Sequence, residues 1–258
     1  MSLFATLALL VHPVATAPVP TSQDCFERFA AIERPSQRVL FVGNSFTFGN
    51  DLPCVVAELA LSLDPPLRLE VGMVARDGMT LEMHWLGGEV ARRLREEQWD
   101  VVVLQEQGSR PITDPALMET HVRRFAAAAR KAGAKVILFQ TWARVNEPET
   151  ESPRAASYRR IAEAVGARVA PVGAAWSLAR TEHPGIRLHA ADGVHASHAG
   201  SYLAASVLLG VLAERSPVGA TATTSGDPDS AETLQALAWR AIAGLPPRRP
   251  GFTPRGAF

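Results

Sequence analysis

Residues 39–50, VLFVGNSFTFGN, begin as an unbroken apolar run and then stop at glycine, asparagine and serine. A short apolar run that ends on turn residues is typical of a strand buried on both faces, as in a parallel sheet covered by helices. Two interpretations of Ser45 follow. It is either an ordinary turn residue, or a nucleophile placed where a buried strand leaves the core. The rest of the sequence has to separate these alternatives.

The remaining chain repeats this strand-and-helix order. Strands are predicted at residues 38–43, 67–75, 100–105, 135–142 and 168–173, and helices at 52–63, 80–98, 114–133, 152–167, 197–215 and 229–243. Asp51 is expected to cap the first helix, while Asp114 and Pro115 suit the start of the third and Gly133 its end. Buried strands separated by amphipathic helices indicate a three-layer α/β/α sandwich around a doubly wound parallel sheet. Ligands bind such sheets outside the carboxyl ends of the strands.

Composition limits the classes of partner. The chain has 258 residues, is 47% hydrophobic and has a formal net charge of zero. One domain of this length buries roughly three quarters of its unfolded surface. Because no basic excess is present, a nucleic-acid partner is not expected. We assign residues 18–35 to a lead-in, 36–244 to a single domain and 245–258, rich in proline, glycine and arginine, to a loose tail.

The N-terminus carries a second apolar run, LFATLALLV at residues 3–11. A helix needs about 20 residues to span a bilayer, so stable membrane insertion is not expected. The run suits the apolar region of a secretory signal, with residues 15–17 as an A-x-A cleavage site. Residues 1–17 are therefore predicted to be a signal peptide and the protein to be secreted or periplasmic, with an N-terminal helix as the alternative. Cys25 and Cys54 fit either a disulfide or two buried thiols.

Asp192 and His195 lie three residues apart, just before the predicted helix at 197–215. In a turn, this spacing can bring the carboxylate to Nδ1 of the imidazole and leave Nε2 free to face a serine. Gly193 gives the backbone the freedom that such a turn requires. A Ser-His-Asp triad needs a base within hydrogen-bond reach of the hydroxyl and a carboxylate on the other ring nitrogen. Asp192 and His195 therefore predict a triad with Ser45.

The blocks GNSFT at residues 43–47 and DGVH at 192–195 resemble the first and last blocks of the SGNH, or GDSL-type, hydrolase superfamily. The similarity is closest to a bacterial branch with a GNSFT serine block, and it covers roughly residues 36 to 215. It implies a flavodoxin-like sandwich and esterase or deacetylase chemistry without metal or cofactor. It also implies that Ser45 is the nucleophile, His195 the general base and Asp192 its orienting partner.

The resemblance further implies an oxyanion hole made by the backbone N–H groups of Ser45 and Gly78 and by a side-chain amide after the third strand. The superfamily's GxND block is absent, but Gln105 or Gln107 can donate as an asparagine does. Both have the same parity on a strand, and Gln105 is preferred because it ends the predicted strand. Glu106 has the opposite parity and is expected to be structural.

Two aromatic side chains are candidates for binding substrate. His84 and Trp142 are predicted to line the pocket, with core packing as the alternative for each. No metal site is expected, because the nearby histidines and aspartate match no zinc spacing: His189, Asp192, His195 and His198.

These observations predict a serine esterase that acts on short-chain acyl esters, including acetyl groups on carbohydrate, through an acyl-enzyme. Ser45 lies in no G-x-S-x-G motif, which argues against an α/β-hydrolase. The missing GxND block motivates one alternative, a carbohydrate-binding protein without catalysis, and an O-acyltransferase is another. The expected partner is a small-molecule or carbohydrate ester. The sequence leaves the acyl length, the leaving group and the oligomeric state open.

Overall fold

The structure, a computed structural model, describes residues 27, 29, 35–222 and 228–245. The predicted signal peptide, most of the lead-in and almost all of the tail lie outside these residues. Within the described part of the chain, no helix is long and apolar enough to cross a membrane. Cys54 is disulfide-bonded. The other cysteine of the sequence, Cys25, lies outside the described residues.

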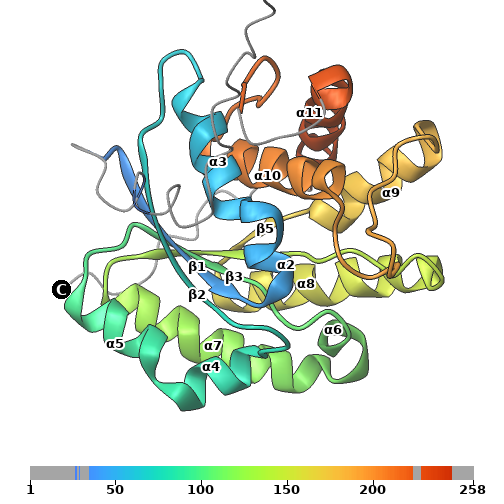
Figure 1. Cartoon of the computed structure of the whole chain (residues 1–258). Coiled ribbons are helices and arrows are strands. Elements are labelled where there is room, and N and C mark those ends of the chain that lie inside the picture. The colour runs from blue at the N-terminus through green and yellow to red at the C-terminus, as the bar shows by residue number, and fades with distance from the viewer. Residues whose placement is uncertain (1–26, 28, 30–34, 223–227, 246–258) are drawn as a thin grey trace, which may run out of the picture.

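A five-stranded parallel sheet forms the centre of the molecule, in the order β2-β1-β3-β4-β5 (Figure 1). Its strands are β1 (Gln37–Gly43), β2 (Leu69–Ala75), β3 (Val101–Leu104), β4 (Lys135–Phe139) and β5 (Arg168–Ala170). This is the order of flavodoxin-like folds, in which the winding reverses between β1 and β3 and ligands bind at that point. The predicted fold class is confirmed.

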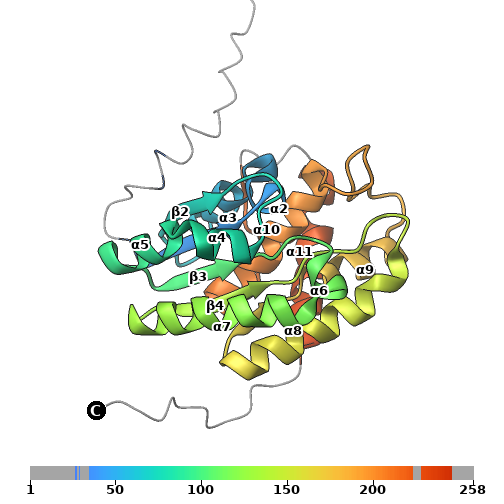
Figure 2. The same ribbon diagram turned by 90° about the horizontal axis from the view of Figure 1, so that it is seen from below.

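Helices cover both faces of the sheet (Figures 1 and 2). One face carries α3 (Leu52–Leu61), α9 (Val172–Glu182), α10 (His198–Ala213) and α11 (Pro228–Ala243), and the other α4 (Leu81–Gly87), α5 (Glu89–Glu96), α7 (Pro115–Lys131) and α8 (Glu151–Val165). Val39 and Phe41 pack into the first core, and Leu40 and Val42 into the second. Alternate side chains of a strand point to opposite faces, so an unbroken apolar run fills both cores.

Short elements at the sheet edge were not predicted: α2 (Ser45–Phe48), η1 (Gly49–Asp51), α6 (Arg110–Thr113) and η2 (Pro148–Thr150). The predicted helix at 80–98 is two helices, because the backbone is left-handed at Gly88 (φ 72°). The predicted fifth strand ends before Pro171, which has no N–H to continue the sheet, and α9 begins there instead.

The two predicted N-caps have different outcomes. Asp114 caps α7, where its Oδ1 accepts a hydrogen bond from the N–H of Leu117 at 3.0 Å. Asp51 precedes α3, but its backbone is left-handed (φ 53°) and its side chain makes no capping bond. Capping residues normally have an extended backbone, so that expectation was wrong.

The end of β1 lies unusually close to the segment after β3. The Gln105 side chain is fully buried there, and its Oε1 accepts hydrogen bonds from the N–H of Asn44 and the hydroxyl of Thr47, both at 2.8 Å. A Cβ at Gly43 would lie 2.2 Å from Thr47 Oγ1 and 2.3 Å from Gln105 Oε1. Glycine is therefore required at this position by close approach.

Replacing Gly43 by alanine should disrupt this contact. We expect Gly43→Ala to lower the free energy of unfolding by about 1–3 kcal/mol, the usual cost of overpacking, measured by urea denaturation. Gly49→Ala is the matched control, because nothing lies within 4 Å of its added Cβ and its φ is −58°. The control should be neutral or stabilising by about 0.4–1 kcal/mol. Equal unfolding free energies for both variants would contradict the argument.

Candidate active site

Ser45 stands where β1 ends and α2 begins, and Asn44 fixes its position. The Asn44 Oδ1 accepts a hydrogen bond from the N–H of Phe46 at 3.1 Å, and its Nδ2 donates to the Met79 carbonyl at 3.0 Å. The second bond ties the turn after β2 to the serine turn. Gly78 belongs to that turn, and it lines the same pocket as Ser45.

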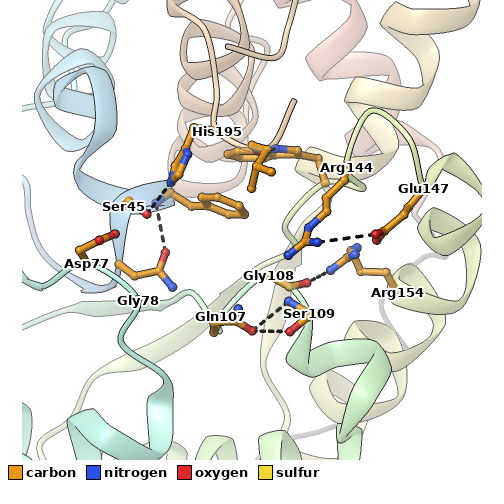
Figure 3. A pocket seen from close by; sticks show the side chains of 14 residues that line it. Ser45, Asp77, Gly78, Gln107, Gly108, Ser109, Arg144, Glu147, Arg154 and His195 are labelled. Atoms are coloured by element: carbon orange, nitrogen blue, oxygen red, sulfur yellow. Dashed lines mark hydrogen bonds and ion pairs between the residues drawn. The ribbon is translucent and has the colours of Figure 1, made fainter. Parts of the chain in front are cut away.

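The structure brings together the three residues predicted to form a triad. His195 Nε2 lies 3.0 Å from Ser45 Oγ, although the two residues are 150 positions apart in the sequence (Figure 3). His195 Nδ1 lies 2.5 Å from Asp192 Oδ2. The carboxylate, the imidazole and the hydroxyl thus form one hydrogen-bonded chain at the carboxyl edge of the sheet.

The second oxygen of Asp192 is also engaged. Its Oδ1 accepts hydrogen bonds from the backbone N–H groups of Val194 at 2.9 Å and His195 at 3.0 Å. The hydrogen bond from the His195 ring and these two backbone bonds hold the pKa of Asp192 well below its usual value. Because Asp192 stays ionised, Nδ1 of His195 is the donor and Nε2 of the neutral ring is the acceptor that faces Ser45. The carboxylate is 48% exposed, so it orients the ring more than it stabilises the fold.

Gly193 makes the Asp192–His195 turn possible in two ways. Its φ is 69°, in the left-handed region that favours glycine. An added Cβ would also lie 2.5 Å from Val145 Cγ1, because the Val145 N–H donates to the Gly193 carbonyl at 3.0 Å. The loop after β4 thus packs directly on the turn that carries the histidine.

Trp142 supports the same turn and lines the pocket. Its indole stacks between Phe46 at 4.6 Å and Trp176 at 4.2 Å, and its Nε1 donates to the Val194 carbonyl at 2.9 Å. Phe46 in turn meets the His195 ring edge to face at 5.5 Å. Both faces of Trp142 are covered, so it offers a ligand only its edge and does not provide a surface on which a sugar ring could stack.

Two predicted site residues lie elsewhere. His84 is buried on α4, where its Nε2 lies 2.7 Å from the Gly43 carbonyl and burial lowers its pKa. It lines no part of the pocket, so the substrate-binding prediction was wrong. The preference for Gln105 was also wrong, because its amide nitrogen donates to the Glu106 carbonyl at 2.7 Å behind the serine turn. The parity argument failed because β3 ends at Leu104.

Gln107 is the glutamine that lines the pocket. Its Oε1 accepts hydrogen bonds from the N–H and hydroxyl of Ser109, at 3.0 and 2.8 Å, and from the N–H of Arg110 at 3.2 Å. Backbone N–H groups can only donate, so these bonds identify the oxygen and leave the NH₂ end as the free donor. Glu106 is buried and accepts from the N–H groups of Leu81 and Gln107, a structural role as predicted.

A scan of protein-family models and a search of curated proteins found no match. Among solved structures, a candidate SGNH hydrolase from Slackia heliotrinireducens is 32% identical, with a TM-score of 0.60 over 68% of this chain and 98% of that one. The chain belongs to the SGNH hydrolase superfamily.

More distant structures share the fold of this SGNH hydrolase. A DUF4886 family protein from Bacteroides uniformis is 20% identical, with a TM-score of 0.66 over 81% of this chain and 95% of that one. Axe2, an acetylxylan esterase from Geobacillus stearothermophilus, is 19% identical, with a TM-score of 0.52 over 68% of this chain and 93% of that one. The family resemblance seen in the sequence is confirmed.

The pocket of this SGNH hydrolase has a volume of about 220 Å³. Four charged residues that line it were not predicted from the sequence: Asp77, Arg144, Glu147 and Arg154. Asp77 adjoins Gly78 and Arg144 follows Trp142 closely, so proximity to predicted residues was the available signal.

His189 hydrogen-bonds the Ala143 carbonyl at 2.9 Å. Among the residues that the structure describes, no group of three or more His, Cys, Asp or Glu side chains could hold a metal ion.

The turn geometry of this SGNH hydrolase can be tested through Gly193. Gly193→Ala should slow labelling of the protein by a fluorophosphonate about 100-fold, because displacing a base by about 1 Å has an effect of that size. Gly185→Ala is the matched control, since its added Cβ meets nothing within 4 Å. Unchanged labelling of a folded Gly193→Ala protein would refute the need for this turn.

Proposed function

We propose that this SGNH hydrolase is a serine esterase that cleaves short-chain acyl esters, with acetyl groups on carbohydrate as the substrate class. The observation that carries the proposal is the hydrogen-bonded chain from Asp192 through His195 to Ser45. It favours an enzyme over a binding protein on the same fold, because a triad with a correctly oriented base serves no purpose in binding alone.

The geometry supports a two-step mechanism. Ser45 Oγ attacks the ester carbonyl while its proton passes to His195 Nε2, and Asp192 stabilises the imidazolium that forms. His195 then gives this proton to the departing alkoxide, which leaves as an alcohol. A water molecule, deprotonated by His195, attacks the acyl group on Ser45. The acid leaves, and the proton returns to the serine oxygen.

We propose that three donors receive the oxyanion: the backbone N–H groups of Ser45 and Gly78 and the Nε2 of Gln107. The Ser45 N–H opens α2, and the first N–H groups of a helix have no partner within it. Asn44 supports the alignment, since it links the turn of Gly78 to the serine turn. The Gln107 oxygen is held by three donors, which fixes the direction of its amide nitrogen.

The substrate class is inferred from the pocket and the fold relatives. A cavity of about 220 Å³ is small, which favours a short acyl group. Axe2, which shares the fold, is named as an acetylxylan esterase. Together these points favour acetyl esters of carbohydrate, a substrate that secretion would place within reach of the enzyme.

Ser45→Ala tests the nucleophile. The variant should hydrolyse p-nitrophenyl acetate only at the background rate while retaining its circular dichroism spectrum, because within the described part of the chain the hydroxyl hydrogen-bonded to His195 Nε2 is that of Ser45. Ser152→Ala, an exposed serine on α8, is the matched control and should keep wild-type turnover.

If wild type turns over no ester of any acyl length and takes no fluorophosphonate label, the carbohydrate-binding alternative is favoured. Product analysis with a sugar acceptor would separate hydrolysis from acyl transfer.

Gln107→Glu tests the oxyanion donor with little change of shape. The carboxylate still accepts from the donors on Ser109 and Arg110, but it cannot donate and it repels a developing oxyanion. We expect kcat for p-nitrophenyl acetate to fall about 10²–10³-fold, with thermal unfolding little changed. Gln98→Glu, an exposed site before β3, is the control. A Gln107→Glu enzyme with wild-type kcat would remove this residue from the oxyanion hole.

A further inference from the structure

The pocket wall beyond the triad contains a buried arginine. Arg154 on α8 is 3% exposed and lines the pocket. Its guanidinium donates to the Gly108 carbonyl and lies 3.5 Å from Thr141 Oγ1 and 3.4 Å from Thr150 Oγ1, all neutral acceptors. No ion pair found among the described residues includes Arg154. The buried guanidinium of Arg154 contacts only neutral oxygens, so its positive charge is not compensated. Such a charge favours the binding of an anion.

The nearest carboxylate on the same helix does not pair with this arginine. Glu151 uses one oxygen to accept from Gln140 Nε2 at 2.8 Å and the other to accept from the Ala143 N–H at 2.9 Å. It therefore reduces the positive potential at Arg154 from a distance, but it leaves the guanidinium without a direct anionic partner. Burial raises the pKa of Glu151, which weakens this effect further at acidic pH.

A second arginine reaches the same part of the pocket from the loop after β4. Arg144 is 47% exposed, and its ion pair with Glu147 is 3.6 Å long. A long, exposed ion pair contributes little, so the guanidinium can turn to a ligand. Figure 3 shows Arg144 and Arg154 converging beside Gly108, across the pocket from Ser45.

The two acidic residues that line the pocket lie at opposite ends of it. Asp77 lies beside Ser45, and Glu147 lies at the arginine end, where it pairs with Arg144 at 3.6 Å (Figure 3). Gln107 and Ser109 line the floor between the two ends and are polar but uncharged. The pocket thus leads from Ser45 past uncharged polar groups to two guanidinium groups, of which only that of Arg144 is ion-paired among the described residues.

We propose that this enzyme prefers esters whose alcohol part carries a carboxylate, namely O-acetylated acidic sugars such as uronic acids. Arg144 binds the carboxylate and Arg154 supplies a fixed positive charge behind it. The planar guanidinium fork matches a carboxylate in shape and charge. The inference rests on the proposed function, because a short acyl group cannot extend to the arginines and the charge must then belong to the sugar.

Three matched substrates test this: acetylated methyl glucuronoside, its uronamide, and the acetylated methyl glucoside, each assayed by acetate release. Wild type should show a kcat/KM at least about tenfold higher for the acid than for the two neutral compounds, given the usual strength of a charged hydrogen bond. Added salt should reduce this ratio. Arg144→Gln should bring the ratio close to one, while Arg95→Gln, an exposed arginine on α5, should keep it.

The outcomes distinguish this inference from the proposed function. A wild-type ratio near one overturns the carboxylate preference, and a high ratio that survives Arg144→Gln overturns the proposal that Arg144 binds the carboxylate. In either case Ser45-dependent turnover of p-nitrophenyl acetate leaves the esterase proposal intact. An equal loss on all three substrates in Arg144→Gln also overturns the role of Arg144, because that pattern indicates a structural role. Absence of Ser45-dependent turnover on every ester removes both proposals. Arg154 is not the test residue, because it also holds the Gly108 carbonyl.

Discussion

The buried amide oxygen of Gln105 is the constraint on which the site depends. A buried acceptor must be hydrogen-bonded, and this one takes the N–H of Asn44 and the hydroxyl of Thr47. The contact is possible only because Gly43 has no side chain. Held in this way, the chain leaves β1 in one direction and presents Ser45 at the edge of the sheet. Asn44 then extends the constraint to the turn after β2, so the carboxyl ends of the first three strands are fixed together.

His195 is brought to Ser45 by a second set of contacts. The turn that carries His195 is held by the loop at residues 140–147, through Trp142 Nε1 on the Val194 carbonyl and the Val145 N–H on the Gly193 carbonyl. Aromatic stacking continues this support to the imidazole itself. Ser45 is thus positioned by β1 and β3, and His195 by the segment after β4. Their meeting at 3.0 Å is the product of both halves of the sheet.

Features that depend on a local sequence pattern could be predicted, whereas features that depend on contacts between distant segments could not. The strands were predictable because alternate residues fill two cores, and the Asp192–His195 turn because three-residue spacing is a local property. The ranking of Gln105 above Gln107 was wrong, since β3 ends at Leu104 and strand position has no meaning beyond it. Arg154 gave no signal at all. Its burial depends on acceptors contributed by other segments, which no pattern along α8 reveals.

The loop at residues 140–147 has two structural roles. It holds the turn of His195 through Trp142 and Val145, and it also places Arg144 in the pocket wall. Insertions or deletions here would displace both Arg144 in the pocket wall and the imidazole of His195 in the same event. Related proteins are therefore expected to differ by individual side chains on this loop, while the length of the loop and the indole of Trp142 stay the same.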